Sequence, residues 1–407
     1  MRVVGGALAV VLVSGVSLAG IATFDVAASV QPDVRLANET EGPPQPRSID
    51  AIPGGVNLLL VGSDSREGQD PVFGGEDATG NLNDVTILLH ISEDHSNASI
   101  ISFPRDTFVP IPECPDPEGG TFSSMSRQKI NTTLSYGGLA CTVLTVERLT
   151  GLSIPYAAEV QFSGVIATST AVGGVPVCVA EPIEDEYTNT YLSAGEHTLA
   201  GFEALQFLRS RHGIGDGSDL TRINNQQVFL SSLARTIRSA ETLADPLKVY
   251  SLAKAVTANM RLSTSLNNVE TLASIAVALK DIDLDKVVFA QVPTGSTEGG
   301  VAPIQPDFDE MFEAIAADQP IKLGGTTGRG ATIDPNAPVT ADPAAPVDPA
   351  AAADPDAVTD PAATDDAAAT PDPSATPADG SVVLPETITG QTAGQHTCSD
   401  GRTLDEQ

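Results

Sequence analysis

Basic side chains follow short apolar segments at several points of this 407-residue sequence, where the ends of buried elements are expected. Arg66 comes shortly after such a segment in Gly62-Ser63-Asp64-Ser65-Arg66, and Arg105 follows another in Ser102-Phe103-Pro104-Arg105. Planar guanidinium groups bind phosphate oxygens through paired hydrogen bonds, so several of them together indicate a phosphate or pyrophosphate site. The other cations in comparable positions are Lys129, Arg209, Arg211 and Arg222.

Three aspartates accompany these cations: Asp64 and Asp84 at strand ends, and Asp219 just before Arg222. Carboxylates repel a pyrophosphate unless a hard cation such as Mg²⁺ lies between them. Arginines, aspartates and a metal together suit phosphoryl transfer, in which catalysis is mostly positioning and charge neutralisation. Each residue also has a structural explanation, as a surface ion pair, a helix cap or a turn, and the spacing alone does not decide between the two.

The charge balance excludes one class of ligand. The chain has 21 basic and 53 acidic side chains and a formal net charge of −32, so it is a poor general nucleic-acid binder. Part of this acidity is local, because residues 331–380 hold ten Asp and ten Pro and no Lys or Arg. The apolar content of 41% argues against disorder of the whole chain.

The N-terminal sequence predicts a membrane anchor. Residues 3–24 form an uncharged run of 22 residues, long enough to cross a bilayer as a helix. A preceding Arg2 and an acidic continuation favour a cytoplasmic N-terminus and an exported body, which predicts a single-pass protein of the cell membrane. The alternative is a cleaved signal peptide, with small residues at 26–28 as the cleavage site.

The remaining chain divides into four predicted segments: a polar linker (26–54), a folded domain (55–325), a disordered Ala/Pro/Asp-rich segment (326–380) and a C-terminal segment (381–407). Apolar runs predict strands in the folded domain at 56–62, 85–92, 99–103 and 286–292. Helical spacing predicts helices at 140–149, 201–211, 220–238, 246–260, 271–280 and 308–317. Strands alternating with helices indicate an α/β fold with helices on both faces of a sheet.

Four cysteines, an even number in a chain expected to be exported, indicate disulfides, and four allow three connectivities. A bridge between Cys114 and Cys141 would staple a Pro-rich loop. It would leave Cys178 and Cys398, which would tie the C-terminal segment to the body. A zinc site is a weaker alternative, because the sequence contains no CxxC motif.

The motifs around these residues resemble the LytR-CpsA-Psr family of membrane-anchored cell-wall enzymes. They occur in family order over roughly residues 56–240. The matching segments are residues 57–66 (NLLLVGSDSR), 83–88 (NDVTIL), 101–106 (ISFPRD), 129–131 (KIN), 136–138 (YGG), 207–212 (FLRSRH) and 217–227 (GSDLTRINNQQ).

The resemblance implies a transferase outside the membrane, with a layered α/β/α fold, a central mixed sheet and an apolar tunnel for a lipid tail. Its donor would be a glycopolymer on polyprenyl pyrophosphate, and its acceptor a muramic acid hydroxyl of peptidoglycan. By similarity, Asp64 and Asp84 would hold Mg²⁺ against the pyrophosphate. Phosphate oxygens would be bound by Arg66, Arg105, Lys129, Arg209 or Arg211, and Arg222, and the polar wall would be completed by Asp219 and Gln226.

One position departs from the family pattern. Many members carry an Arg two residues before the second Asp, where this chain has Leu82, so one cation is missing unless Arg66 substitutes. An apolar Leu82 would alternatively face the lipid. No His stands in an obvious general-base position, although His212 adjoins the Arg pair. Two alternatives to the transferase stay open, a polyprenyl-pyrophosphate hydrolase and a non-catalytic, wall-associated lipid-binding protein.

Overall fold

The computed structural model of the chain describes residues 25–26, 28–29, 31–37, 39, 55–73, 80–116, 118–337 and 380–407. The predicted membrane-spanning run, residues 3–24, lies outside the described residues, as does most of the predicted disordered segment. In the described part of the chain, no helix is both long enough and apolar enough to span a membrane.

A mixed sheet of seven strands forms the centre of the fold. The order across the sheet is β13 (Met260–Leu262), β8 (Tyr156–Val160), β1 (Val56–Ser63), β2 (Asn83–Ile91), β3 (Ala98–Phe103), β14 (Val287–Gln291) and β20 (Gly390–Thr392). Strands β1, β3, β8 and β14 point the same way, and β2, β13 and β20 run antiparallel to them. The predicted α/β fold with a mixed sheet is therefore confirmed.

Both faces of the sheet are apolar, which explains why its strands read as continuous apolar runs. In β1, Leu59 and Val61 belong to one buried cluster, whereas Leu58 and Leu60 pack against another. Alternate residues of a strand point to opposite faces, so each face needs its own covering layer. The first cluster contains α2 (Thr133–Thr150) and α9 (Asp307–Ala316).

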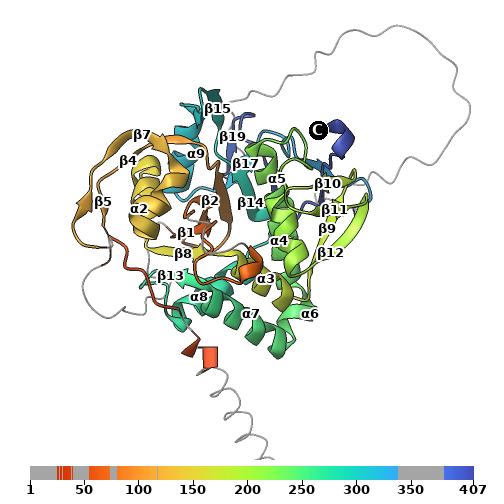
Figure 1. Ribbon diagram of the computed structural model, residues 1–407, viewed down its shortest axis with the longest axis horizontal. Coiled ribbons are helices and arrows are strands. Elements are labelled where there is room, and N and C mark those ends of the chain that lie inside the picture. Colours follow the sequence, from red (N-terminus) through yellow and green to blue (C-terminus); the bar gives the residue numbers. More distant parts are fainter. Residues whose placement is uncertain are drawn as a thin grey trace, which may run out of the picture.

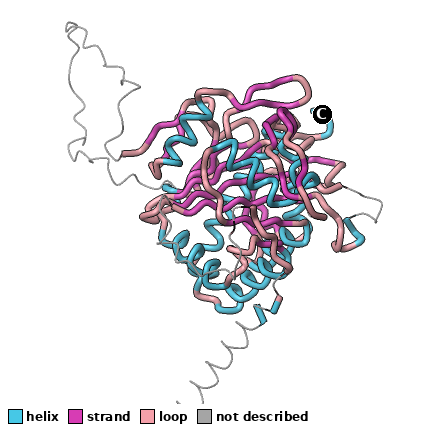
Figure 2. Tube along the Cα trace, turned by 90° about the vertical axis from the view of Figure 1, so that its left-hand side faces the viewer, coloured by secondary structure: helices cyan, strands magenta, loops and turns pink. Residues whose placement is uncertain are grey.

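The second face is covered by the other long helices (Figure 1). These are α3 (Phe162–Ala171), α4 (Phe202–Arg209), α5 (Asp219–Arg238) and α8 (Val269–Asp281). Helix α7 (Pro246–Asn259), preceded by the short α6 (Ala240–Leu243), packs on α3. Figure 2 shows the strands passing between helical layers, which is the layered arrangement expected from alternating strands and helices.

A smaller sheet packs on the far side of α5. Its order is β12 (Gly195–Leu199), β9 (Val175–Val179), β21 (Thr397–Ser399) and β18 (Ala331–Ile333). The remaining strands form five pairs. They are β4 (Phe108–Ile111) with β7 (Met125–Lys129), β5 (Cys114–Pro115) with β6 (Thr121–Phe122), β10 (Ile183–Asp185) with β11 (Thr190–Leu192), β15 (Thr294–Thr297) with β16 (Gly300–Pro303), and β17 (Ile321–Leu323) with β19 (Val382–Leu384).

Two predicted boundaries are wrong. Part of the predicted linker belongs to the folded domain, because Leu36 is buried in the core beside α2 and the Val34 N–H donates to the Leu262 carbonyl. The predicted disorder starts too early, since β18 lies within residues 326–337. The C-terminal segment is no separate unit, because β20 joins the central sheet and β21 the smaller one. These short strands join by backbone pairing, which side-chain composition does not reveal.

Both disulfides suggested by the sequence are present, Cys114–Cys141 and Cys178–Cys398. The first joins the β5 loop to α2, where Gly137 allows the two segments to approach closely. A Cβ atom at Gly137 would lie 2.8 Å from the Cβ atom of Cys141 and 2.9 Å from the Pro115 carbonyl oxygen. The second bridge connects β9 with β21, so it fastens the C-terminal segment to the body.

Candidate active site

The strand directions bring three of the predicted site residues to one edge of the central sheet. Asp64 follows the end of β1, Arg105 follows the end of β3, and Asp84 is the second residue of β2. Because β2 runs antiparallel to both neighbours, its beginning lies beside the ends of β1 and β3. The crevice at such strand ends is the usual ligand site of α/β sheets.

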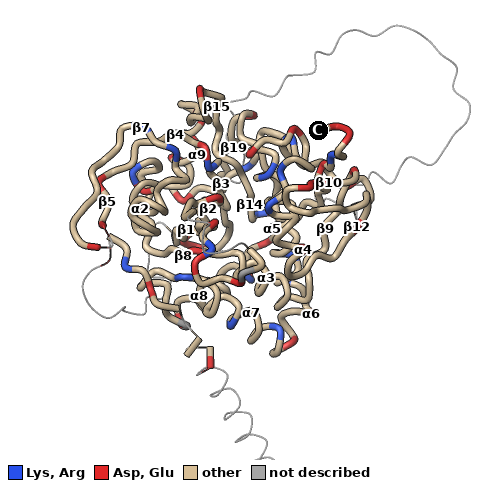
Figure 3. The backbone as a smooth tube through the Cα atoms, viewed as in Figure 1, with Lys and Arg blue, Asp and Glu red and all other residues tan. Residues whose placement is uncertain are grey.

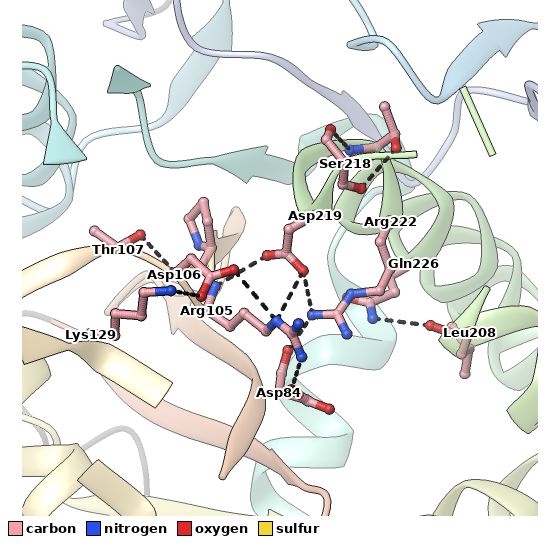
Figure 4. A network of polar contacts seen from close by, with 12 residues as sticks. Asp84, Arg105, Asp106, Thr107, Lys129, Leu208, Ser218, Asp219, Arg222 and Gln226 are labelled. Atoms are coloured by element: carbon pink, nitrogen blue, oxygen red, sulfur yellow. Dashed lines mark hydrogen bonds and ion pairs between the residues drawn. The ribbon is translucent and has the colours of Figure 1, made fainter. Parts of the chain in front are cut away.

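Arg105 and Arg222 are joined to the same two aspartates (Figure 4). Arg105 Nη1 donates to Asp84 Oδ1 at 2.5 Å, and the Arg105 N–H donates to Asp219 Oδ2 at 3.3 Å. Arg222 Nη2 lies 2.7 Å from Asp219 Oδ1 and donates to the Asp84 carbonyl oxygen at 2.7 Å. Asp219 thus connects the end of β3 with the first turn of α5, so it positions the two arginines relative to each other.

Lys129 extends this network on the side of β7. Its Nζ donates to Asp106 Oδ1 at 2.7 Å, and Arg105 Nε lies 3.7 Å from the other oxygen of Asp106. Burial raises the pKa of Asp106, but the hydrogen bond from Lys129 and the charge of Arg105 outweigh it, so the pKa is lowered. The sequence analysis assigned no role to Asp106, which stood only within the matching segment 101–106. In the structure, Asp106 holds Lys129 beside Arg105.

Two arginines are desolvated at the site. Burial lowers the pKa of the Arg222 guanidinium, whose side chain is 5% exposed. Burial also lowers the pKa of Arg209, and the nearby charge of Arg66 lowers it further. In Arg105, by contrast, burial lowers the pKa, but the carboxylates of Asp84, Asp219 and Asp106 raise it more strongly. Arg209 and Arg222 are cations that an anionic ligand would stabilise.

An apolar cavity of about 200 Å³ adjoins the network, between the sheet and helices α3, α4 and α5. Its wall is mostly aliphatic and aromatic. The lining includes Leu60, Ile87, Phe162, Val165, Leu205, Leu208, Phe229, Leu230 and Leu233. Asp84, Arg209, Arg222 and Gln226 line the same cavity, so polar groups of the network and a long apolar surface share one space.

The turn after α4 carries two of the predicted arginines and depends on a residue that the sequence analysis missed. Asp185 at the end of β10 is fully buried, and its Oδ2 accepts from Ser210 Oγ at 2.8 Å and from the N–H groups of Arg211 and His212 at 2.9 and 3.1 Å. This carboxylate fixes the backbone between Arg209 and Arg211. It lies among other acidic residues in the sequence and far from the motifs, so no local signal distinguishes it.

The other predicted residues lie at or near the same crevice. Arg66 is half-buried and influences both Asp64 and Arg209 electrostatically. Gln226 is buried and its Nε2 donates to the Leu208 carbonyl at 3.2 Å. His212 is exposed, and its ring lies 4.3 Å from that of Tyr187, so it takes no part in the network.

Leu82 contributes its backbone to the site. Its N–H donates to Asp64 Oδ1 at 2.6 Å, and the Asp64 N–H donates to its carbonyl at 3.0 Å. Its half-buried side chain is not among the residues that line the apolar cavity in the described structure.

The chemistry of Asp64 and Asp84 fits a divalent cation. Burial raises the pKa of Asp64, and the charge of Asp84 raises it further, although the Leu82 N–H opposes these effects. A cation beside the Asp64 carboxylate would stabilise its ionised form, and hard cations such as Mg²⁺ prefer carboxylate oxygens. These two residues are therefore suitable metal ligands.

Comparison with known proteins places the chain in a family. The LytR_cpsA_psr family model matches residues 28–317. The cell wall biosynthesis protein LcpA of Corynebacterium glutamicum is 27% identical over 318 residues, which make up 70% of this chain and 60% of LcpA. The polyisoprenyl-teichoic acid–peptidoglycan teichoic acid transferase TagT of Bacillus subtilis is 25% identical over 290 residues, covering 70% of this chain and 83% of TagT.

The fold has solved counterparts as well. The LytR-Csp2A-Psr enzyme from Actinomyces oris superimposes with a TM-score of 0.50 at 23% sequence identity, covering 69% of this chain and 96% of that chain. This similarity concerns the fold alone. Because the family model spans most of the sequence, the protein belongs to the LytR-CpsA-Psr family.

Proposed function

We propose that the protein is a phosphotransferase that moves a glycopolymer from polyprenyl pyrophosphate to peptidoglycan, outside the cytoplasmic membrane. The proposal rests on one observation: charged residues of the cation network line the apolar cavity. Asp84, Arg209 and Arg222 line the same space as a run of aliphatic side chains. A ligand that fits such a space has a long apolar tail and an anionic head.

The names of two relatives support a lipid-linked donor and a role in the cell wall. TagT is named for a polyisoprenyl-linked donor and a peptidoglycan acceptor, and LcpA for cell wall biosynthesis. We infer the same class of donor and acceptor for this chain. The predicted anchor would then hold the catalytic domain on the outer side of the membrane, where both substrates are exposed.

In the proposed reaction, the oxygen of a muramic acid hydroxyl attacks the phosphorus attached to the glycopolymer. The bond from this phosphorus to the bridging oxygen of the pyrophosphate breaks, and polyprenyl phosphate leaves with the electron pair. Negative charge grows on that leaving phosphate, so donors fixed around it lower the barrier. In this proposal Arg105, Arg209 and Arg222 would bind these oxygens, with Arg66, Arg211 and Lys129 as further cations of the same crevice.

Asp64 and Asp84 would hold Mg²⁺, which neutralises charge on a pyrophosphate and withdraws electrons from phosphorus. Asp219 acts on the arginines, because one of its oxygens accepts from the Arg105 N–H and the other faces Arg222. Gln226 lines the cavity and contributes a polar edge beside Arg222. The hydroxyl proton is released to solvent, and its removal needs little assistance from a base in a loose phosphoryl-transfer transition state.

Reconstitution with a lipid-linked donor and peptidoglycan tests the proposal. We expect polymer to become joined to peptidoglycan, with one polyprenyl phosphate released for each polymer transferred. Removing one hydrogen-bond donor that stabilises charge in the transition state typically lowers kcat by a factor of about 10²–10³, so we expect a decrease of about this size for Arg105→Ala. Arg105→Lys keeps the charge but not the paired geometry, so we expect a smaller loss.

The two alternative functions, hydrolase and non-catalytic lipid-binding protein, predict different results. Release of phosphate without polymer on peptidoglycan would replace the transferase with a hydrolase. Unchanged wall attachment in cells that carry both Asp64→Ala and Arg105→Ala would replace it with a non-catalytic lipid-binding protein. Glu310 of α9, which is exposed and neither lines the cavity nor pairs with the cation network, provides the control, since Glu310→Ala should leave transfer unchanged.

A further inference from the structure

A second cavity, of about 310 Å³, lies between α5 and the smaller sheet. Its wall on α5 consists of Val228, Ser232, Arg235 and Thr236. These residues occupy a different face of the helix from Arg222 and Gln226, which line the apolar cavity, so the two cavities are separate. The rest of the wall belongs to or adjoins strands β9, β12, β18 and β21: Pro176, Val177, Cys178, Glu196, Asp334, His396 and Thr397.

The two central strands of the smaller sheet separate at this cavity. The parallel pairing of β9 with β21 joins Cys178 to Cys398 and Val179 to Ser399, and in the described structure it extends no further toward Pro176 and His396. The disulfide Cys178–Cys398 lies where the strands still meet. It therefore holds together the two strands that form this wall.

The C-terminal segment completes the cavity. The family model ends at residue 317, whereas Asp334, His396 and Cys398 lie beyond that position. Figure 1 shows the C-terminal end, in blue, on the same side of the molecule as β9 and β12. Half of the charged lining thus comes from sequence outside the family match and outside the motifs of the candidate active site.

Arg235 is a cation without a carboxylate partner in this cavity. Its Nη1 donates to the Ala393 and Gln395 carbonyls at 2.7 and 2.9 Å, and among the described residues its Nε and Nη2 have no partner. Burial lowers the pKa of Arg235, although the charge of Glu196 opposes this effect. Lys and Arg are sparse over the described chain (Figure 3), so a partly buried arginine that faces a cavity is informative.

Two carboxylates face the same space. Glu196 and Asp334 both line it, and no ion pair within the described part of the chain engages either of them. The Asp334 N–H donates to the His396 carbonyl at 3.0 Å, and a carboxylate oxygen of Asp334 lies within 4.8 Å of both disulfide sulfurs. These sulfurs are bonded to each other and are not available as thiolate ligands, so the group is not a metal site.

We propose that this cavity binds a zwitterionic amino-acid group, with its carboxylate on Arg235 and its ammonium between Glu196 and Asp334. A guanidinium forms paired hydrogen bonds with a carboxylate, and an ammonium donates to carboxylate oxygens. A ligand with a single charge would leave part of this lining uncompensated, whereas a zwitterion satisfies both signs. The size of the cavity suits an amino acid at the end or side of a short peptide.

The source of this group rests on the proposed function. Stem peptides of peptidoglycan carry free carboxylates and, on their diamino acid, a free amine. Arg235 follows Arg222 by 13 positions in α5, which corresponds to about 20 Å along the helix axis. An extended peptide of about five residues spans about 17 Å. A stem peptide in this cavity would therefore hold the acceptor glycan near the cation network.

Titration calorimetry on the full chain in detergent micelles, without donor, tests the proposal. The probe is the tripeptide N-acetyl-L-alanyl-γ-D-glutamyl-diaminopimelate. We expect it to bind, and we expect acetylation of the diaminopimelate amine to lower the affinity about tenfold. Arg235→Gln and Glu196→Gln should each have an effect of similar size, whereas Arg148→Gln, which changes an exposed residue of α2, should have none. Because Arg235 also holds the Ala393 and Gln395 carbonyls, circular dichroism checks the fold of its variant, and the exposed Glu196 gives a test independent of that contact.

The possible results separate the steps of this inference. Absence of tripeptide binding, or parent affinity in both Arg235→Gln and Glu196→Gln, overturns the site. Equal affinity for the acetylated tripeptide overturns the zwitterion. In reconstituted transfer, Glu196→Gln should raise KM for peptidoglycan about tenfold and affect kcat less, and an unchanged KM overturns peptidoglycan as the source. The tripeptide should bind Arg105→Ala as tightly as the parent, so loss of transfer without loss of this binding is a failure of the proposed function alone.

Discussion

The buried carboxylate of Asp185 gives a quantitative prediction about the turn that holds Arg209 and Arg211. Replacing Asp185 with Asn keeps the size of the side chain but exchanges one acceptor oxygen for an NH₂ group. One oxygen of Asp185 accepts from Ser210 Oγ and from the N–H groups of Arg211 and His212, and the other accepts from the N–H groups of Tyr187 and Thr188. In either amide orientation, the new NH₂ group therefore meets donors.

The expected cost follows from these bonds. A hydrogen bond to a charged group contributes about 1.5–3 kcal/mol, and an unsatisfied buried donor costs about 1–3 kcal/mol. Since the effects within one network are not additive, we expect Asp185→Asn to lower the free energy of unfolding by about 3 kcal/mol. Displacement of Arg211 should also reduce kcat/KM for transfer by about tenfold to a hundredfold, which corresponds to about 1.4–2.8 kcal/mol.

Urea unfolding of the full chain in detergent micelles, followed by circular dichroism, measures the stability change. Asp283→Asn is the matched control, because Asp283 is exposed and caps a backbone N–H, a role that Asn performs equally well. We expect that variant to stay within about 0.5 kcal/mol of the parent protein. If Asp185→Asn unfolded like the parent and transferred polymer at the parent rate, Asp185 would not be what fixes the turn.

The same residue predicts a pH dependence. Burial raises the pKa of Asp185, but the hydrogen bonds from the Arg211 N–H and Ser210 outweigh burial and lower the pKa below the ordinary value of 3.8. The stabilisation is therefore fully present above the unfolded-state pKa and is lost as the pH falls through the folded-state pKa. The stability difference between the parent and Asp185→Asn should shrink only at such acidic pH.

Three further changes test the metal site, the cavity and the disulfides. Burial and the charge of Asp84 raise the pKa of Asp64 above its ordinary value of 3.8. The affinity for Mg²⁺, measured by titration calorimetry, should therefore fall as the pH drops through this raised pKa, because the protonated carboxyl is a poor ligand. The variant Asp64→Asn should lack this pH-dependent fall in affinity. Val165→Phe narrows the cavity, so we expect about a tenfold higher KM for donors with long prenyl chains and no change for short-chain donors. Cys398→Ser removes a disulfide between residues 220 positions apart, and Cys141→Ser removes one between residues 27 positions apart. From the loop-closure entropy of the unfolded chain, we expect the free energy of unfolding in urea to fall by about 5 kcal/mol for the first variant and about 3.5 kcal/mol for the second. Equal losses would contradict the entropic account.

The sequence was most informative for the elements that are buried on both sides. Strands β1, β2, β3 and β14 were predicted within two residues at each end, because the α/β layering makes them continuous apolar runs. Helix α3 was missed, because Phe162–Ala171 contains a glycine and several hydroxyl residues, which weaken the helical pattern. The strands of the C-terminal segment were missed because their pairing joins positions as distant as Cys178 and Cys398, which no local pattern indicates.

The site residues were recognisable as motifs, but their relations were not. The sequence indicated that Asp219 accompanies Arg222 and suggested Asp219 as a helix cap, but the structure gives that role to Ser218, whose Oγ accepts from the Thr221 N–H, and makes Asp219 the first residue of α5. Only the fold shows that Asp219 also accepts from the Arg105 N–H, 114 positions earlier in the chain. The role of Asp185 depends in the same way on the approach of β10 to the turn after α4. Spacing identifies residue types that suit a reaction, and the tertiary structure decides which of them touch.

The structure also divides the cations that the sequence treats alike. Three of them are already paired with carboxylates: Arg105 with Asp84, Lys129 with Asp106, and Arg222 with Asp219. Within the described residues, no comparable ion pair engages the other three, Arg66, Arg209 and Arg211. The proposed pyrophosphate donor carries two negative charges, so the unpaired group would supply the attraction, whereas the paired group is already fixed in place by its carboxylates. In the proposed function, the strongly negative chain would therefore attract the anionic donor through a few described cations without carboxylate partners, held within a frame of paired ones.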